Sequence, residues 1–468
     1  MNLSLESIEL DVRAGRSVRA REALREFDVD NCSRAERLQF ANLCRRSSDP
    51  SRGLAALRPA IRPPARSPVR ARPEEKVEYA ACLQWLGLVA EAEQLLQNVE
   101  VPGALLERAF LALRRWSYED AIGFLERYLA HDSLSAYERL VGRVNLLAAL
   151  VHERHWGQAE SELVGLRASL AAPGLENLRL NCLKQELEMA VERGQIKKVN
   201  ALRAELENAP LGGDDYSKLF LAKWLAVVKL RADPAEGKKL LAGVRQKALD
   251  LDHFETLRDC DAQEASVSGD PILSARVFQG TPYVSFRNRF ALHNGGSLPA
   301  EVWVSFADSI SCEFKGEAPY LEIGGLPGKL LSFLHSDFYV APTVPQIFGA
   351  LFPYRHYHEI HGPNLVHQAL FRLRRELVPF GARVEERAGR YYFRAETPWK
   401  LLRPGAGDSI ASQFSRWEML DPFSTEQLAQ NRGWSLRKAQ RFLKDHAQDF
   451  RLMRLGRNLR YSVKQKNQ

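Results

Sequence analysis

The chain has 468 residues, which is too long for one hydrophobic core and indicates about three domains. Its composition, with 45% apolar and 26% charged residues, is ordinary for a globular protein, and no apolar run reaches the ~18–20 residues of a membrane span. The net charge of +8 lies at one end, because the segment between Ser424 and Gln468 contains eleven Lys and Arg but only three acidic residues. These features exclude a membrane protein and favour a polyanionic partner such as nucleic acid. The first residues lack the basic start and apolar core of a secretory signal, so we expect a cytoplasmic protein.

Residues 1–270 are expected to form an all-helical repeat, because their apolar positions recur with helical spacing. A turn residue followed five positions later by a small or apolar residue recurs every 29 to 40 residues, a period typical of helix-turn-helix solenoids. The pairs are Gly15 and Ala20, Ser48 and Gly53, Gly87 and Ala92, Trp116 and Ala121, Arg154 and Ala159, Gly194 and Val199, and Ala232 and Gly237. The segments LRRWSYEDAIGFLERYLAHD and VHERHWGQAESELVGLRASLA resemble tetratricopeptide repeats. Such arrays bind a protein, a peptide or a small signal on their concave surface.

The stretch Arg58–Arg72 (RPAIRPPARSPVRAR) interrupts this pattern. Its four prolines predict that it is not regular helix. It is either an exposed basic loop or hinge, or an ordinary connection between repeats, and the second interpretation is favoured.

After Pro271 the pattern changes to short strand-like runs, at 302–306 and 320–323. Helices are expected at 328–335, at 343–351 with Thr343 as the N-cap, and at 364–377. A hairpin is expected at 382–386 and 390–394, around a turn at Ala388-Gly389. The segments LLSFL…PTVPQIFGALFP, LVHQALFRLRREL and VEERAGRYYF resemble the winged helix-turn-helix of OmpR/PhoB-class regulators. This module spans 283–397.

The helix at 364–377 is the candidate recognition element. Its apolar residues fall on one face, and the opposite face carries groups suited to the edges of adenine and guanine in a major groove. The resemblance implies that two wing arginines approach the minor groove or the backbone. The candidate DNA-binding residues of this module are Asn364, Gln368, Phe371, Arg372 and Arg375 on the helix, and Arg387 and Arg390 on the wing.

The loop before this helix contains three histidines, His356, His358 and His361. The resemblance implies that this loop contacts RNA polymerase. A transition-metal site is the alternative, but no cysteine or carboxylate set completes it, so we expect no metal and no cofactor.

A linker at 398–420 leads to a second module at 421–464. A helix at 425–431, a helix starting with LRKAQRFLKDHAQ and a hairpin at 450–463 resemble a minimal winged helix of transcription regulators. Leu436, Ala439, Phe442 and Leu443 form the expected buried stripe, and a disordered basic tail would not sort its residues in this way. The candidate DNA-binding residues are Arg437, Lys438, Arg441 and Lys444 on the helix and Arg454, Arg457 and Arg460 on the wing, with Arg437 and Arg441 as the base readers.

The expected fold class is therefore mainly α (α+β), with an N-terminal α-solenoid of helical hairpins and two small winged-helix domains. The sequence contains no phosphate loop, nucleophile elbow, zinc-protease or kinase signature, so we do not expect an enzyme. The expected function is a transcriptional regulator that binds double-stranded DNA. The alternatives are a plasmid- or phage-type replication or partition initiator, and a protein-interaction scaffold.

Overall fold

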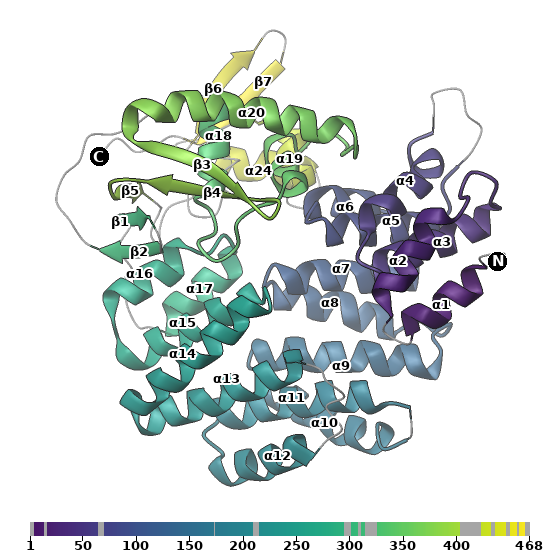
Figure 1. The fold of residues 1–468 in the computed structure, drawn as a ribbon, viewed down its shortest axis with the longest axis vertical. Helices are drawn as coiled ribbons and strands as arrows, with labels where there is room; N and C mark the ends of the chain where they lie inside the picture. The colour runs from purple at the N-terminus through teal and green to yellow at the C-terminus, as the bar shows by residue number, and fades with distance from the viewer. Residues whose placement is uncertain are drawn as a thin grey trace.

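The structure is a computed structural model that describes residues 4–13, 16–63, 70–172, 174–208, 215–293, 301–307, 310–313, 325–402, 423–431, 436–445, 450–455 and 458–463. Within these ranges the fold is mainly helical, and small antiparallel sheets occur in the last third of the chain (Figure 1). None of the described helices is both long and apolar enough to cross a membrane.

In the described part of the chain, helices α1 to α14 form seven consecutive pairs whose members pack against each other. The pairs are α1 (Leu5–Arg13) with α2 (Ser17–Glu26), α3 (Arg34–Arg46) with α4 (Pro50–Ile61), α5 (Pro73–Trp85) with α6 (Val89–Leu96), α7 (Pro102–Arg114) with α8 (Tyr118–Leu129), α9 (Ala136–His152) with α10 (Trp156–Ser169), α11 (Glu176–Glu192) with α12 (Ile196–Asn208), and α13 (Asp215–Ala232) with α14 (Pro234–Asp250).

The recurring turn and small residue of the sequence have structural counterparts in these pairs. The small residue lies buried in the second helix of every pair, at Ala20, Gly53, Ala92, Ala121, Ala159, Val199 and Gly237. Contact at these positions is close, since a Cβ on Gly53 would come within 2.9 Å of the Cys82 Sγ. The turn residue has a positive φ at Ser48, Gly87, Trp116, Arg154 and Gly194, so the left-handed conformation reverses the chain between the two helices. Gly15 lies outside the described residues, and Ala232, the remaining predicted turn residue, is instead the last residue of α13.

Helix α4 corrects one expectation, because it continues through Pro59 and ends at Ile61. Pro59 has no N–H to donate to the carbonyl of the preceding turn, so one helical hydrogen bond is missing there, and the helix ends two residues later. Residues 64–69 of the same stretch lie outside the described residues.

The helical region was predicted to end at residue 270, but helices continue to His293, and the strand predicted at 302–306 is confirmed by the strand at Glu301–Phe306. Helix α15 (Phe254–Ser268) precedes Pro271, and α16 (Pro271–Gln279) and α17 (Val284–His293) begin at it or follow it. Pro271 is the first residue of α16, and the Asp270 carboxylate accepts hydrogen bonds from the backbone N–H groups of Ile272 and Leu273. Asp-Pro is thus a helix start here rather than the end of the helical region. We call α1 to α17 the helical array.

Residues 301–402, the first module, combine a sheet, three helices and a hairpin. Its elements are β1 (Glu301–Phe306), β2 (Ile310–Glu313), α18 (Gly325–Leu334), α19 (Val344–Leu351), α20 (His361–Leu377), a 3-10 turn η1 (Val378–Phe380), β3 (Ala382–Arg387), β4 (Arg390–Ala395) and β5 (Trp399–Leu402). The predicted helices and hairpin are confirmed, whereas the strand predicted at 320–323 lies outside the described residues. The antiparallel sheet has the order β2-β1-β5, so β5 returns to the module from within the predicted linker.

Residues 423–463, the second module, contain α23 (Thr425–Asn431), α24 (Leu436–Asp445), and the antiparallel strands β6 (Phe450–Leu455) and β7 (Asn458–Val463). Ala439 and Leu443 are buried in its small core with Phe423 and Phe450, and Phe442 packs against them. Leu436 was predicted to belong to this buried stripe, but it is 45% exposed. It is the first residue of α24, so it lies at the end of the helix, beyond the residues that pack against the core.

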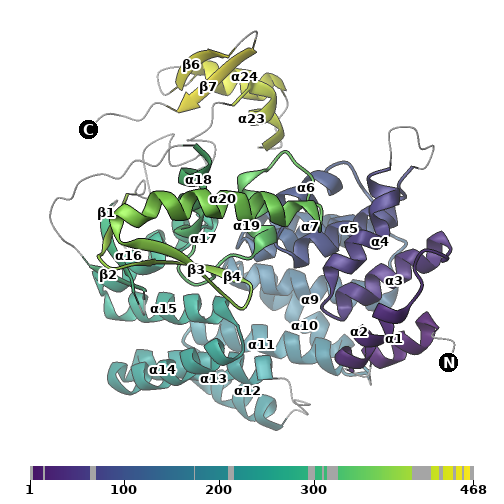
Figure 2. The ribbon, with the colours of Figure 1, turned by 45° about the horizontal axis from the view of Figure 1, so that its top comes forward.

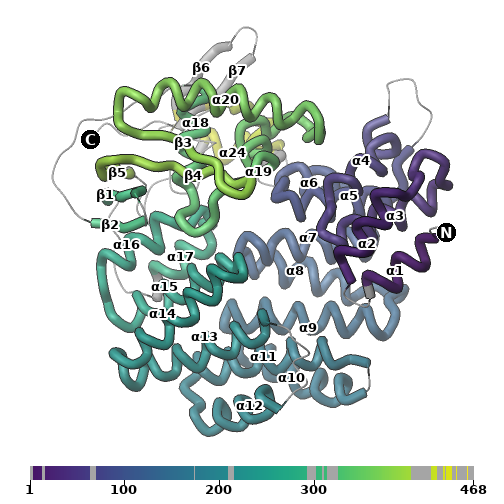
Figure 3. The backbone as a smooth tube through the Cα atoms, viewed as in Figure 1, coloured from purple at the N-terminus to yellow at the C-terminus, as the bar shows by residue number. Residues whose placement is uncertain are grey.

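The backbone trace in Figure 3 shows the array curving from α1 through α12 to α17, with the first module lying across the gap between the two arms of this curve. Figure 2 shows the same arrangement from a second direction. The chain therefore returns at its C-terminal third to helices that it formed near its start.

Candidate nucleic-acid interface

Helix α20 has two distinct faces, as its sequence predicts. Val366, Ala369, Leu370, Leu373 and Leu377 are buried against the rest of the first module. The opposite face exposes all five predicted groups, Asn364, Gln368, Phe371, Arg372 and Arg375.

Side chains on the exposed face of α20 are accessible to a binding partner. The Phe371 side chain is 62% exposed, which is unusual for a large apolar residue. No hydrogen bond or ion pair involves the side chains of Arg372 or Arg375 within the described residues. Arg374, in contrast, donates through Nε to the carbonyl oxygen of Val384 at 3.0 Å, so it braces the hairpin.

The hairpin of β3 and β4 lies beside α20 and is built on the predicted turn. Ala388 and Gly389 both have positive φ, at 50° and 74°, which is the geometry of a two-residue type I′ turn. Arg387, before the turn, is exposed and donates to the Glu385 carboxylate at 2.8 Å. Three arginine side chains (Arg383, Arg387 and Arg394) surround Glu385, and hydrogen bonds from Arg383 and Arg387 lower the pKa of its carboxyl group.

Arg390, the second predicted wing residue, points back into the molecule. Its Nη1 donates to the carbonyl oxygen of Ala341 at 2.9 Å, and its guanidinium lies over the Phe254 ring of α15, 5.2 Å from the ring centre. The structure therefore groups Arg387 with the exposed surface and Arg390 with the junction between the first module and the array.

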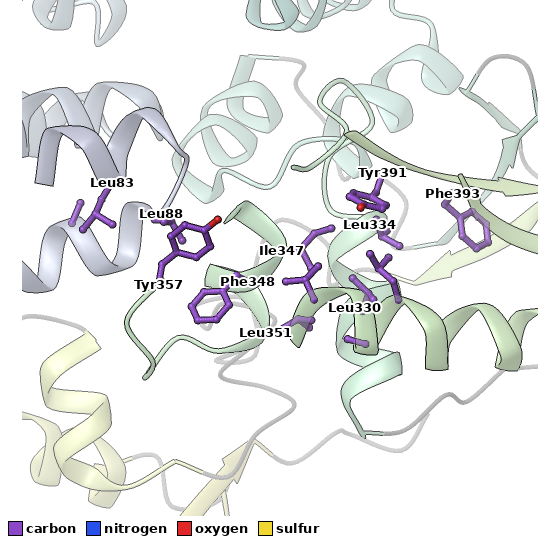
Figure 4. Packing of buried hydrophobic residues seen from close by; sticks show 14 of the residues in the cluster. Leu83, Leu88, Leu330, Leu334, Ile347, Phe348, Leu351, Tyr357, Tyr391 and Phe393 are labelled. Carbon is purple, nitrogen blue, oxygen red and sulfur yellow. The ribbon is translucent and has the colours of Figure 1, made fainter. Parts of the chain in front are cut away.

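The histidine loop before α20 docks on α4, α5 and α6. Tyr357 is 5% exposed and lies next to Leu88, with Leu83 close behind (Figure 4). The Glu91 carboxylate of α6 accepts from the Tyr357 backbone N–H at 2.9 Å and lies 3.2 Å from the His356 Nδ1.

Polar contacts reinforce this side of the first module. Glu359 forms an ion pair with Arg58, in the last turn of α4. The histidines are not joined by further ligands, since no group of three or more His, Cys, Asp or Glu placed to hold a metal ion occurs among the described residues.

The other side of the first module is fixed to α15 and α16 by buried charge. The Arg258 guanidinium is 0% exposed and donates to Asp337 at 2.7 Å, and its Cζ lies 4.9 Å and 5.1 Å from the ring centres of Tyr283 and Tyr339. The Tyr339 hydroxyl donates to the Asp261 carboxylate at 2.9 Å.

Sequence patterns did not identify these docking residues. The sequence offered one indication for Arg258, because it lies four and seven residues before the buried Ala262 and Ala265 and so on the same face of the helix. A charged residue at such a position indicates a buried partner.

Helix α24 exposes Arg437, Arg441 and Lys444 on the side away from its core. The side chains of Lys438, Arg454 and Arg460 are not described, although the backbone of Arg454 and Arg460 lies in β6 and β7, opposite Leu459 and Met453 respectively. Arg457 lies outside the described residues.

No protein-family model, curated protein or solved structure matches this chain.

Proposed function

We propose that this chain is a DNA-binding transcriptional regulator in which α20 reads a major groove. In this proposal the first and second modules are winged helices, with α20 and α24 as recognition helices. The single observation that carries it is the sorting of α20, whose buried apolar face is opposed by an exposed face with Asn, Gln, Phe and two arginines free of partners within the described residues.

The chemistry of this face suits duplex DNA. A major groove of about 12 Å admits one helix, Arg pairs bidentately with guanine, and Asn or Gln pairs with adenine. Phe371 suits contact with a thymine methyl group. The exposed Arg387 lies on the adjoining hairpin, where it supports a backbone contact after exchanging Glu385 for phosphate.

The second module supplies the positive charge that draws the chain to a polyanion. Arg437, Arg441 and Lys444 are exposed on α24, and the segment from Ser424 carries the whole net charge of the chain. This surface is proposed to act with α20 on one duplex.

The helical array is proposed to be a tetratricopeptide-like solenoid that binds a protein, a peptide or a small signal and controls the DNA-binding modules. The exposed side of the loop before α20, at Tyr354 and Ile360, is the proposed contact for RNA polymerase.

The proposal is tested by selecting bound duplexes from a random pool with the full chain, followed by titration of the selected duplex at several salt concentrations. Arg372→Ala with Arg375→Ala is expected to weaken specific binding by about 30- to 10⁴-fold, since each bidentate Arg contact contributes about 1–3 kcal/mol. Arg179→Ala with Lys197→Ala, on α11 and α12, removes the same charge far from α20 (Figure 1) and is the matched control.

Two results would refute the proposal. If the full chain ignores duplex DNA even at low salt, the modules act in protein contacts and the scaffold alternative holds. If the α20 and control variants lose affinity equally, the binding is general electrostatic attraction and α20 does not read sequence.

A further inference from the structure

The start of α5 presents two arginines on a rigid base. Arg70 and Arg72 are exposed, and no ion pair or hydrogen bond engages either side chain in the part of the chain that the structure describes. They are the last two of six arginines between Pro50 and Pro73, a stretch that contains no Asp or Glu. We call Arg70 and Arg72 the flank arginines.

The backbone that carries the flank arginines is held in place by a buried carboxylate. Glu75 is 1% exposed, accepts from the Arg72 backbone N–H at 2.7 Å, and forms an ion pair with Arg34. Arg34 Nη2 also donates to the Arg70 carbonyl oxygen at 2.6 Å. These bonds satisfy backbone groups and leave both guanidinium groups in solvent. The position is therefore preorganised, and its two positive charges remain available to a ligand.

The flank arginines lie on the side of the molecule where α20 begins. Arg58, in the last turn of α4, pairs with Glu359, two residues before the first residue of α20. Helices α4 and α5 pack side by side, so the start of α5 adjoins the end of α4. Figures 1 and 2 both show these two helix ends toward the same side of the molecule as α20.

The dimensions of α20 determine what meets the DNA at its N-terminal end. Its 17 residues span about 25 Å, whereas a major groove is about 12 Å wide. A helix seated in the groove is therefore about twice as long as the groove is wide, and the segments just beyond its two ends lie beside phosphate strands. Groups next to its N-terminal end then face the backbone rather than the bases.

We infer that the flank arginines form a second DNA contact, which binds the phosphate backbone beside the N-terminal end of α20. This inference rests on the proposed function of α20 and adds a surface from the helical array to the same duplex. The array then positions the DNA directly, in addition to carrying the modules. The contact carries no sequence information, because a phosphate is the same at every base pair.

The experiment measures the salt dependence of duplex binding for the full chain and for Arg70→Ala with Arg72→Ala. Each phosphate contact contributes about 0.9 to the slope of log affinity against log salt, so the variant is expected to have a slope shallower by about 2. Its affinity falls by the same factor on the selected duplex and on a scrambled one, because the contact is to phosphate. Arg70→Lys with Arg72→Lys retains the slope, since a lysine ammonium also binds phosphate as a point charge.

The controls separate this inference from the proposed function. If the alanine variant keeps the parent slope while Arg372→Ala with Arg375→Ala still abolishes specific binding, the flank contact is wrong and the function of α20 stands. The flank contact is equally wrong if the loss matches that of Arg179→Ala with Lys197→Ala. If the parent chain does not bind duplex DNA, the proposed function itself fails, and the inference fails with it.

Discussion

Asp337→Asn is expected to open the junction between the first module and the helical array. Arg258 is fully buried, and Asp337 accepts a charge-assisted hydrogen bond from its Nη2 at 2.7 Å. The Nε and Nη1 groups of Arg258 have no hydrogen-bond partner within the described residues. Loss of one partner of a buried ion pair costs about 3–5 kcal/mol when the other charge is left uncompensated. Arg258 keeps a second partner, the partly exposed Glu255 carboxylate 3.4 Å from its Nε, so the expected cost is at the lower end of this range.

The substitution isolates the charge from the other role of Asp337. The Asp337 Oδ1 also accepts from the backbone N–H groups of Tyr339 and Val340, at 2.8 and 3.2 Å, and an asparagine oxygen can accept both bonds. A loss of about 3 kcal/mol raises the equilibrium population of the locally open state by about 100-fold, since each 1.4 kcal/mol is a factor of ten. Hydrogen exchange of the intact chain, followed in α15 and around Asp337, measures this opening.

A double variant decides whether the buried charge is the cause. Arg258→Met with Asp337→Asn removes the guanidinium as well as the carboxylate, so exchange is expected to return close to the parent rate. If the double variant exchanges as fast as Asp337→Asn alone, the opening arises from altered packing and the electrostatic cause is refuted.

Two further predictions concern the helical array. Gly237→Ala is expected to lower the free energy of unfolding by about 1–3 kcal/mol, because the new Cβ would overlap the Leu230 backbone. Gly243→Ala on the same helix meets open space and is expected to raise it by about 0.5–1 kcal/mol. Thermal melts of both variants measure these changes, and equal shifts in melting temperature would contradict the prediction. Burial raises the pKa of Glu107 to about 7, helped by the nearby Glu78. The folded chain thus retains a proton that the unfolded chain releases above the ordinary value of 4.5, and stability falls as the pH rises through this window, by up to about 3 kcal/mol. Glu107→Gln is expected to make the stability nearly independent of pH between pH 5 and 8, as measured by thermal melts. A variant whose stability falls with pH as steeply as that of the parent would contradict the assignment.

The helix pairs were predictable because their signal is local. A small residue at a helix crossing recurs in sequence, and the turn five residues earlier accompanies it, as at Gly87 and Ala92. The turns at Trp116 and Arg154 show the limit of residue preferences, because both adopt the left-handed conformation that usually favours glycine. Their positions followed from the period rather than from their chemistry.

The faces of α20 were predictable for the same reason, since the apolar period of the helix defines its buried side. The orientation of Arg390 was not predictable, because Phe254 lies 136 residues earlier in the chain and only the tertiary fold brings it near. The docking of the first module on α6 through Glu91 and Tyr357 has the same character. A single sequence carries no pattern that links such distant partners.

The end of the helical array shows a different limit, because it was predicted at residue 270 and the helices continue to His293. Short apolar segments fit a helix or a strand equally well, and the Asp270 cap with Pro271 at the first helical position decides in favour of α16. Leu436 was misplaced because a helix of ten residues leaves its first position outside the packed stripe.

The apolar cluster that joins the first module to α5 and α6 has a consequence for synthesis of the chain. Leu83 and Leu88 emerge from the ribosome long before Tyr357 and Phe348, which pack in the same cluster. At a translation rate of about 5–20 residues per second, these leucines wait roughly 15 to 55 seconds for the residues that cover them. A nascent chain that pauses in this interval exposes this hydrophobic surface to solvent, and binding by a chaperone at that stage would protect it from aggregation.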